Sequence, residues 1–151
     1  MGQPSRAEVE AAFQKYLKLG AEERNWNAWA DLFAEDAYYY EVQYGEFHGR
    51  EAIRKWITTT MAGVPDMFFP APKWVMIDGD RVAFCIDNAY PNPKDPAAPP
   101  IAFPTYTILR YAGGGLWSSE EDVYDVRASL EARAAYRAMG GNAVAPHGKY
   151  T

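Results

Sequence analysis

Residues 38–42, YYYEV, place one carboxylate among side chains that favour a β-strand. Alternate residues of a strand share a face, so Tyr39 and Glu41 are expected to point the same way. A carboxylate surrounded by aromatic rings is poorly solvated, which disfavours its charged form and raises its pKa. Such a group can take a proton from carbon, while a tyrosine hydroxyl stabilises the resulting enolate. Glu41 is therefore a candidate base, with Tyr39 as a donor to oxygen.

A second tyrosine lies on the apolar face of the first predicted helix. Ser5 and Glu8 form a capping box, so a helix is expected to begin there. Tyr16 is the one polar side chain on the face that this helix would bury. Its hydroxyl reaches either the surface or a pocket, and in a pocket it would also donate to oxygen.

Further acids occur late in the chain, in segments with the alternation of strands. Residues 116–124, LWSSEEDVY, form one such segment, in which positions 118, 120, 122 and 124 share a face. A run of three acids, Glu120 to Asp122, is typical of a solvated strand end. An earlier strand offers Asp87 or Asn88, and its pattern leaves open which of the two faces the interior.

Two kinds of periodicity divide the chain. Apolar residues recur at helical spacing within residues 5–20, 26–33 and 50–61. From residue 74 the period is two, interrupted by an Asp-Gly turn, by a proline-rich segment at 91–104 and by a glycine-rich turn. Asp125 is expected to cap a last helix. This order predicts an α+β fold with three early helices, a mainly antiparallel sheet and a C-terminal helix.

The sequences LFAEDA, YYYE and GEFHGREAI, which together span most of residues 32–53, resemble the SnoaL-like branch of the nuclear transport factor 2-like superfamily. Members include polyketide cyclases, ketosteroid isomerases, dehydratases, limonene-type epoxide hydrolases and proteins that only bind. The resemblance implies that the curved sheet wraps around the helices as a cone, which leaves a pocket inside. One fold of this kind supports several reactions, so the chemistry must be argued from the residues.

The resemblance also implies roles for individual residues. Glu41 occupies the position of the carboxylate base of the ketosteroid isomerase branch, and Tyr16 stands near a first-helix tyrosine that donates to an oxyanion. The sequence EDVYD resembles the end of the last strand in the epoxide hydrolase branch, which selects Asp122 as a pocket acid. That branch has an aspartate near Asp87 as well, but its arginine two residues earlier is replaced here by Cys85.

The predicted function is cofactor-independent isomerisation, cyclisation or dehydration of a small, apolar, cyclic or polyketide-like molecule. One alternative is epoxide opening by water, with Asp87 and Asp122 sharing the acid and base roles. Another is a non-catalytic binding or dimerisation module. The predicted catalytic residues are Glu41, Tyr39, Asp122, Asp87 and Tyr16. The residues predicted to contact the substrate are Trp29, Trp56, Phe68, Asn88, Phe103 and Tyr106.

Composition argues against several other classes of function. The net charge is −5 without a basic stripe, which argues against nucleic acid and against an anionic membrane surface. One cysteine and two histidines are too few for a zinc site, and no glycine-rich phosphate loop or dinucleotide fingerprint is present, so no metal or cofactor is expected. The single Cys85 is compatible with a reducing compartment, and we expect a cytoplasmic protein.

The length of 151 residues predicts one domain, residues 1–151, with a loose tail at 142–151. Tyr38 and Tyr40 are expected on the outer face of the sheet. Outward aromatic side chains are typical of an interface, so a homodimer through this face is predicted.

Overall fold

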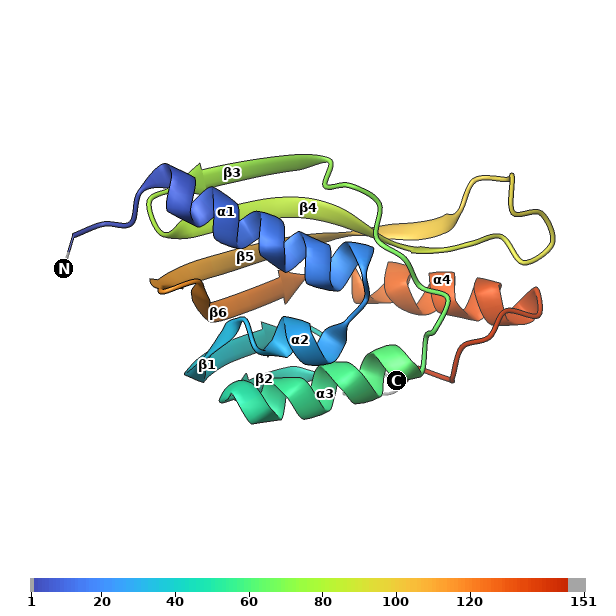
Figure 1. Ribbon diagram of the computed structural model, residues 1–151. Helices are drawn as coiled ribbons and strands as arrows, with labels where there is room; N and C mark the ends of the chain where they lie inside the picture. Colours follow the sequence, from blue (N-terminus) through green and yellow to red (C-terminus); the bar gives the residue numbers. More distant parts are fainter. Residues whose placement is uncertain (1, 147–151) are drawn as a thin grey trace.

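The computed structural model describes residues 2–146 and confirms the α+β architecture (Figure 1). Three N-terminal helices are followed by most of a curved sheet and by one C-terminal helix. In chain order the elements are α1 (Arg6–Leu17), the π-helical turn η1 (Lys18–Glu22), α2 (Trp26–Ala30), β1 (Phe33–Glu41), β2 (Gly45–His48), α3 (Arg50–Ala62), β3 (Trp74–Asp78), β4 (Arg81–Tyr90), β5 (Ile101–Gly113), β6 (Leu116–Val123) and α4 (Val126–Ala138).

The six strands form one sheet in the order β2-β1-β6-β5-β4-β3. Neighbouring strands are antiparallel except for β1 and β6, which run parallel. The parallel register sets Tyr39 opposite Glu120 and Glu41 opposite Asp122. The tyrosine-rich strand and the acidic strand are far apart in sequence, yet this pairing makes them neighbours.

Helices α1, α2 and α3 lie over the face of the sheet that faces the viewer in Figure 1. The capping box is present, because the Ser5 hydroxyl oxygen accepts a hydrogen bond from the Glu8 N–H at 3.1 Å. The buried stripe of α1 packs on the sheet, and the Phe13 ring lies 5.0 Å from the ring of Phe84. Helix α2 is shorter than its apolar spacing predicted, because Phe33 already begins β1.

Helix α4 packs against the ends of β4 and β5 (Figure 1). The predicted cap is present, since the Asp125 carboxylate accepts hydrogen bonds at 3.0 and 3.2 Å from two N–H groups of the first turn. Farther along the helix the Tyr136 ring stacks on Tyr90 with 4.6 Å between ring centroids. The position of α4 on the sheet is therefore fixed at both ends of the helix.

Two segments predicted to be irregular lie outside the sheet. Residues 91–100 form a loop that extends beyond the strands it joins, whereas residues 101–104, predicted to be irregular as well, belong to β5 (Figure 1). The start of the C-terminal tail is attached to the end of α3, because the Val144 N–H donates to the Gly63 carbonyl at 2.9 Å. The rest of the tail, 147–151, lies outside the described residues.

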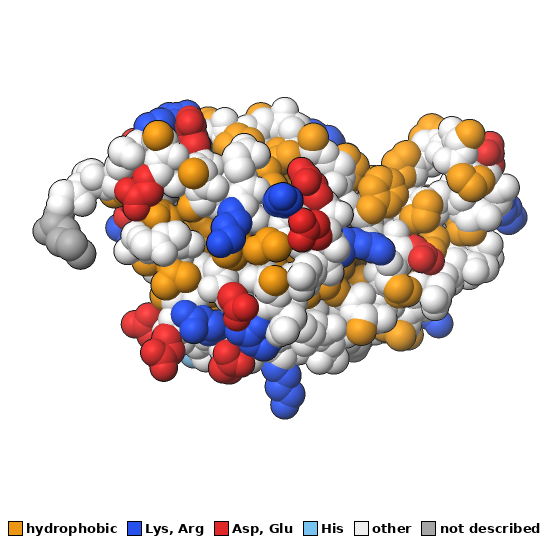
Figure 2. Space-filling model, viewed as in Figure 1, with side chains coloured by type: hydrophobic (Ala, Val, Ile, Leu, Met, Phe, Trp, Pro, Cys, Tyr) orange, Lys and Arg blue, Asp and Glu red, His pale blue; other side chains and the backbone are white. Residues whose placement is uncertain are grey.

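The surface carries charges of both signs. Figure 2 shows acidic and basic side chains interspersed over the face that bears the helices. Among residues 2–146, every helix is too short or too polar to cross a membrane.

Replacing the cap of α4 should weaken the fold measurably. Asp125→Ala leaves two N–H groups without an acceptor, and we expect the free energy of unfolding to fall by about 1 kcal/mol. Asp125→Asn is the matched control, because asparagine caps a helix about as well and should stay close to the wild type. Urea denaturation followed by circular dichroism measures both, and equal values for the two variants would contradict the assigned cap.

Candidate active site

A cavity of about 130 Å³ lies between the sheet and the helices. An apolar cavity of about 150 Å³ is large enough to hold benzene, so the space suits a molecule with one ring. Much of its wall is aromatic. The aromatic lining residues are Tyr16, Trp26, Trp29, Tyr39, Tyr44, Trp56, Phe69, Phe84, Phe103 and Tyr124.

One wall of the cavity depends on a residue without a side chain. Gly20 lies in the π-helical turn η1, a type of irregularity that is frequent at functional sites. A Cβ at this position would come within 2.8 Å of Cδ1 of Trp29 and 3.3 Å of Trp26. The two tryptophan rings can therefore occupy this wall only because residue 20 is glycine.

Glu41 ends β1 inside the cavity, where its side chain is 3% exposed. The chain turns directly after it, so that Oε2 accepts hydrogen bonds from the N–H groups of Tyr44 at 2.7 Å and Gln43 at 3.2 Å. Within residues 2–146, Oε1 has no hydrogen-bond partner. One oxygen is held by the backbone, and the other is left for a ligand.

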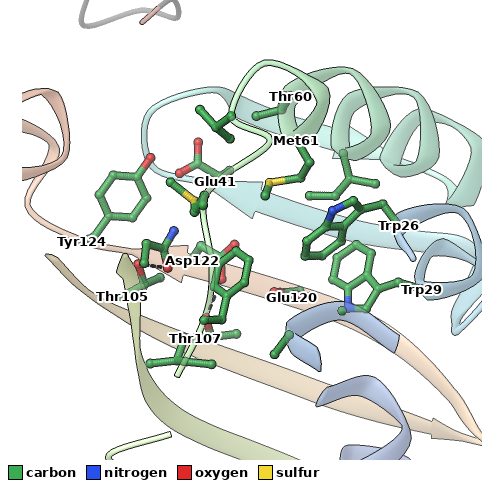
Figure 3. Close-up of a pocket in the computed structure, with 18 of the residues that line it drawn as sticks. Trp26, Trp29, Glu41, Thr60, Met61, Thr105, Thr107, Glu120, Asp122 and Tyr124 are labelled. Atoms are coloured by element: carbon green, nitrogen blue, oxygen red, sulfur yellow. Dashed lines mark hydrogen bonds between the residues drawn. The ribbon is translucent and has the colours of Figure 1, made fainter. Parts of the chain in front are cut away.

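Burial raises the pKa of Glu41 from 4.5 to about 7. The negative charge of Asp122 acts in the same direction. The Tyr124 hydroxyl and the two backbone N–H groups lower the pKa again but do not offset burial. The Tyr124 hydroxyl lies beside this site, but its one proton is donated to Oε1 of Gln43 at 3.2 Å, which leaves Oε1 of Glu41 without a donor among residues 2–146. Figure 3 shows Tyr124 at one side of the cavity and the tryptophans at the other, with Glu41 and Asp122 between them.

A second carboxyl cluster lies deeper in the cavity, on β6. Glu120 is 2% exposed, and its Oε1 accepts hydrogen bonds from the hydroxyls of Tyr16 at 2.7 Å and Tyr39 at 3.0 Å. The Tyr39 hydroxyl also contacts Oδ2 of Asp122. The other oxygen of Asp122 accepts a hydrogen bond from the Thr107 hydroxyl at 2.6 Å. Two phenols and two carboxyl groups thus form one network.

This network is suited to holding an extra proton. The Tyr39 hydroxyl has a single proton and contacts both carboxyl groups, so a proton on one of the carboxyl groups would complete the second contact. Burial, followed by the charge of Asp122, raises the pKa of Glu120 well above its usual range. Burial also raises the pKa of Asp122, although Thr107 and Tyr39 oppose the change. Burial thus favours the protonated form of both acids.

A sequence profile described as SnoaL-like domain matches residues 13–119. The chain belongs to the SnoaL-like family. A search of curated proteins found no match.

Solved structures agree with this membership. A protein of ketosteroid isomerase-like fold from Catenulispora acidiphila, crystallised with trimethylamine, is 25% identical with a TM-score of 0.64, and the match covers 86% of this chain and 95% of that one. A protein from Shewanella putrefaciens described as a SnoaL-like polyketide cyclase is 15% identical, with a TM-score of 0.69 and coverage of 85% and 86%. An epoxide hydrolase of LEH-like type from M. tuberculosis is 16% identical, with a TM-score of 0.65 and coverage of 89% and 98%. The last two likenesses concern the fold alone.

Most of the residues predicted for the site meet in the cavity of this SnoaL-like domain. Those that line it are Tyr16, Trp29, Tyr39, Glu41, Trp56, Asn88, Phe103 and Asp122. Trp56 packs directly on Tyr39, with 4.8 Å between ring centroids. Among the described residues, no group of histidine, cysteine and acidic side chains has an arrangement suited to a metal ion.

Asp87 lies outside the cavity, so the prediction of a pocket acid there is corrected. Strand β4 turns Phe84, Ile86 and Asn88 inward, and alternation then places Asp87 on the outer face. There its carboxylate forms an ion pair with Nζ of Lys73 at 2.9 Å. The choice left open between Asp87 and Asn88 falls on Asn88, whose Oδ1 accepts a hydrogen bond from the Thr105 hydroxyl.

Two predicted substrate contacts also lie outside the cavity. Tyr106 is 47% exposed on the outer face, because its neighbours Thr105 and Thr107 turn inward. Phe68 pairs its backbone with Ala89, and the flanking Met67 and Phe69 line the cavity in its place.

Glu120, Ser129 and Arg133 are among the lining residues that were not predicted. Glu120 shares a face of β6 with Asp122, so choosing Asp122 as an inward acid implied an inward Glu120 as well. Ser129 and Arg133 come from α4 and are both buried. An arginine on a helix is ordinarily exposed, and the sequence carries no clear signal that this one lines the cavity.

The raised pKa of Glu41 makes stability depend on pH. A carboxyl group with a higher pKa in the folded state binds its proton more tightly there, so stability falls as pH rises from about 4.5 to about 7. We expect Glu41 to account for a fall of about 3 kcal/mol over this range, at about 1.4 kcal/mol per pH unit. Glu41→Gln should remove this part of the fall.

Urea denaturation at a series of pH values measures the effect. Glu35→Gln is the matched control, because it neutralises an exposed carboxylate of β1 and should keep the wild-type profile. Parallel profiles for wild type and Glu41→Gln would show that Glu41 keeps an ordinary pKa.

Proposed function

We propose that this SnoaL-like protein is a cofactor-independent enzyme that moves a proton within a small cyclic molecule, by isomerisation, cyclisation or dehydration. The observation that carries the proposal is Glu41, a buried carboxyl group with one oxygen fixed by backbone N–H groups and the other unpartnered within residues 2–146. With a pKa of about 7, it is both ionised and protonated to a useful extent near neutral pH. That is the condition under which one group can accept a proton and later return it.

The network on β6 supplies the complementary acid. A carbonyl or hydroxyl oxygen bound beside it would accept a hydrogen bond from Tyr39 or from the proton held by Glu120 and Asp122. When Glu41 takes a proton from the neighbouring carbon, negative charge develops on that oxygen, and these donors stabilise it. Return of the proton to another carbon completes an isomerisation. Protonation of a leaving hydroxyl by the network completes a dehydration.

Two further observations support a small-molecule ligand and argue against epoxide opening. The neighbour from Catenulispora acidiphila was crystallised with a small organic molecule, trimethylamine. The epoxide-opening hypothesis needed Asp87 and Asp122 to face each other, and Asp87 instead pairs with Lys73 on the outer face. The geometry therefore favours proton transfer centred on Glu41.

Replacing Glu41, the proposed base, should abolish most of the proton transfer while the ketone still binds in the cavity. We expect Glu41→Gln to slow deuterium exchange at the carbon next to the carbonyl of 2-cyclohexenone, a ring of suitable size, by about 10²- to 10⁴-fold. Glutamine keeps the shape of the side chain, so binding of the ketone should change little. NMR spectroscopy measures both the exchange and the binding.

Two controls separate the possible outcomes. Asp122→Asn should reduce the rate of deuterium exchange less than Glu41→Gln does. A larger reduction by Asp122→Asn would mean that Asp122, and not Glu41, is the base. Glu35→Gln, at an exposed position of β1, should leave exchange unchanged. Binding of the ketone with no exchange above the background rate in the wild type would identify a binding module without catalysis.

We also propose that two copies associate through the outer face of the sheet. The register places Trp74, Cys85, Tyr106 and Val123 in one row across four strands, and Met76, Ala83, Ile108, Glu121 and Tyr40 in a second row. The large apolar side chains of this patch are 41% to 62% exposed. A contiguous apolar surface of this kind is typical of an interface.

A charge in the middle of this face should prevent association. We expect light scattering of the wild type to give twice the 17.0 kDa of one chain, and Ile108→Glu to give a single chain. Val144→Glu is the control, because Val144 is exposed and apolar but lies away from the sheet. A wild-type monomer at micromolar concentration would contradict the proposed dimer.

A further inference from the structure

Arg133 lines the cavity from α4 and has no part in the proton transfer described above. Its side chain is 7% exposed, and its Nε donates to the Tyr90 hydroxyl at 3.3 Å. No carboxylate within residues 2–146 lies at ion-pair distance from it. The cavity therefore contains a buried guanidinium whose protein contacts are neutral.

Such an arrangement is costly unless something else compensates the charge. A buried ion loses its hydration, and a neutral hydroxyl restores only part of that loss. Burial lowers the pKa of Arg133, but the oxygens of Tyr90 and Tyr44 raise it above its ordinary value, so the group stays charged. A guanidinium has five N–H donors in a planar fork, and two phenols do not use them all.

Two other polar groups that line the cavity come from the elements that carry Arg133 and its partner Tyr90. Ser129, one turn before Arg133 on α4, is 6% exposed and offers a hydroxyl group. Asn88 lies two residues before Tyr90 on the same face of β4, and its Oδ1 is occupied by Thr105. The amide nitrogen of Asn88 keeps its two N–H donors. Three side chains thus offer donors here.

The carboxyl groups of the cavity are not paired with Arg133 in the part of the chain that the structure describes. Glu41, Glu120 and Asp122 have hydrogen-bond donors of their own, and burial disfavours the ionised form of each and raises its pKa. Arginine cannot lose its proton in the same way. The charge of Arg133 is therefore fixed and remains available to a ligand.

We propose that Arg133, with Ser129 and Asn88, binds a carboxylate of the ligand, so that the ligand is a small cyclic acid. Arginine pairs with a carboxylate through two parallel hydrogen bonds, which also fixes the orientation of the ring. The ring then lies between the aromatic walls, within reach of Glu41. The inference rests on the proposed function in so far as the ligand is called a substrate.

Three probes of one shape test the charge preference. Benzoate, benzamide and benzylamine carry a negative, a neutral and a positive group on the same ring, and tryptophan fluorescence reports their binding because Trp26, Trp29 and Trp56 line the cavity. At neutral pH we expect benzoate to bind about tenfold or more tightly than benzamide, and benzylamine to bind most weakly. Arg133→Gln should reduce benzoate to the affinity of benzamide and leave benzamide nearly unchanged.

Two variants make the result specific. Arg133→Lys keeps the charge without the fork and should retain part of the preference for benzoate. Arg137→Gln removes an exposed arginine of the same helix and should leave all three affinities unchanged. The thermal transition of Arg133→Gln shows whether this variant folds. If it does not, the ratio of benzoate to benzamide affinity in the wild type and in Arg133→Lys tests the proposal. Equal affinity of the wild type for benzoate and benzamide, or tighter binding of benzylamine, would overturn the inference.

The outcome is independent of the test of catalysis. A preference for benzoate that Arg133→Gln abolishes, together with unchanged deuterium exchange in Glu41→Gln, would leave an acid-binding protein without the proposed catalysis. Loss of exchange in Glu41→Gln without a preference for benzoate would leave the enzyme and remove the acidic ligand.

Discussion

The parallel pairing of β1 with β6 determines what the cavity contains. Every other neighbouring pair in the sheet is antiparallel, and a parallel pair needs a long connection between its strands. Here that connection includes α3 and four strands, β2 to β5, so it also forms much of the cavity wall. The register sets Tyr39 against Glu120 and Glu41 against Asp122. Without this pairing the phenols and the carboxyl groups would not meet, and each acid would need a separate partner.

Within residues 2–146, the acids of the cavity are stabilised by hydrogen bonds and not by ion pairs. Backbone N–H groups hold Glu41 at the end of its strand, whereas phenols hold Glu120 in the interior. These environments affect the two acids differently, because the pKa of Glu41 is raised to about 7 and burial raises that of Glu120 well above its usual range. Neighbouring carboxyl groups with separated pKa values are a general device for combining a base with an acid. Burying these carboxyl groups lowers the stability of the fold, as is common at functional sites.

Local rules predicted the parts of the fold that depend on local chemistry. Helical spacing, the capping box at Ser5 and the Asp125 cap all gave elements that the structure contains. Alternation also placed Glu41 inside, because the family resemblance fixed which face of β1 is inward. In β4 both faces carry apolar residues, so the pattern could not separate Asp87 from Asn88. The burial of Arg133 could not be predicted from the sequence for another reason. It depends on where α4 packs, and that is determined by the fold of the whole chain.

Gly20 in η1 shows how the range of substrates could change among proteins of this fold. Its missing side chain is the reason that Trp29 can lie where it does, so part of the cavity's size is set by what residue 20 lacks. A change from glycine to a larger residue would push an aromatic ring toward the ligand without altering any group that handles protons. Substrate range and catalytic chemistry are therefore separable in this architecture, and new substrates can be acquired through wall positions while the acids stay as they are.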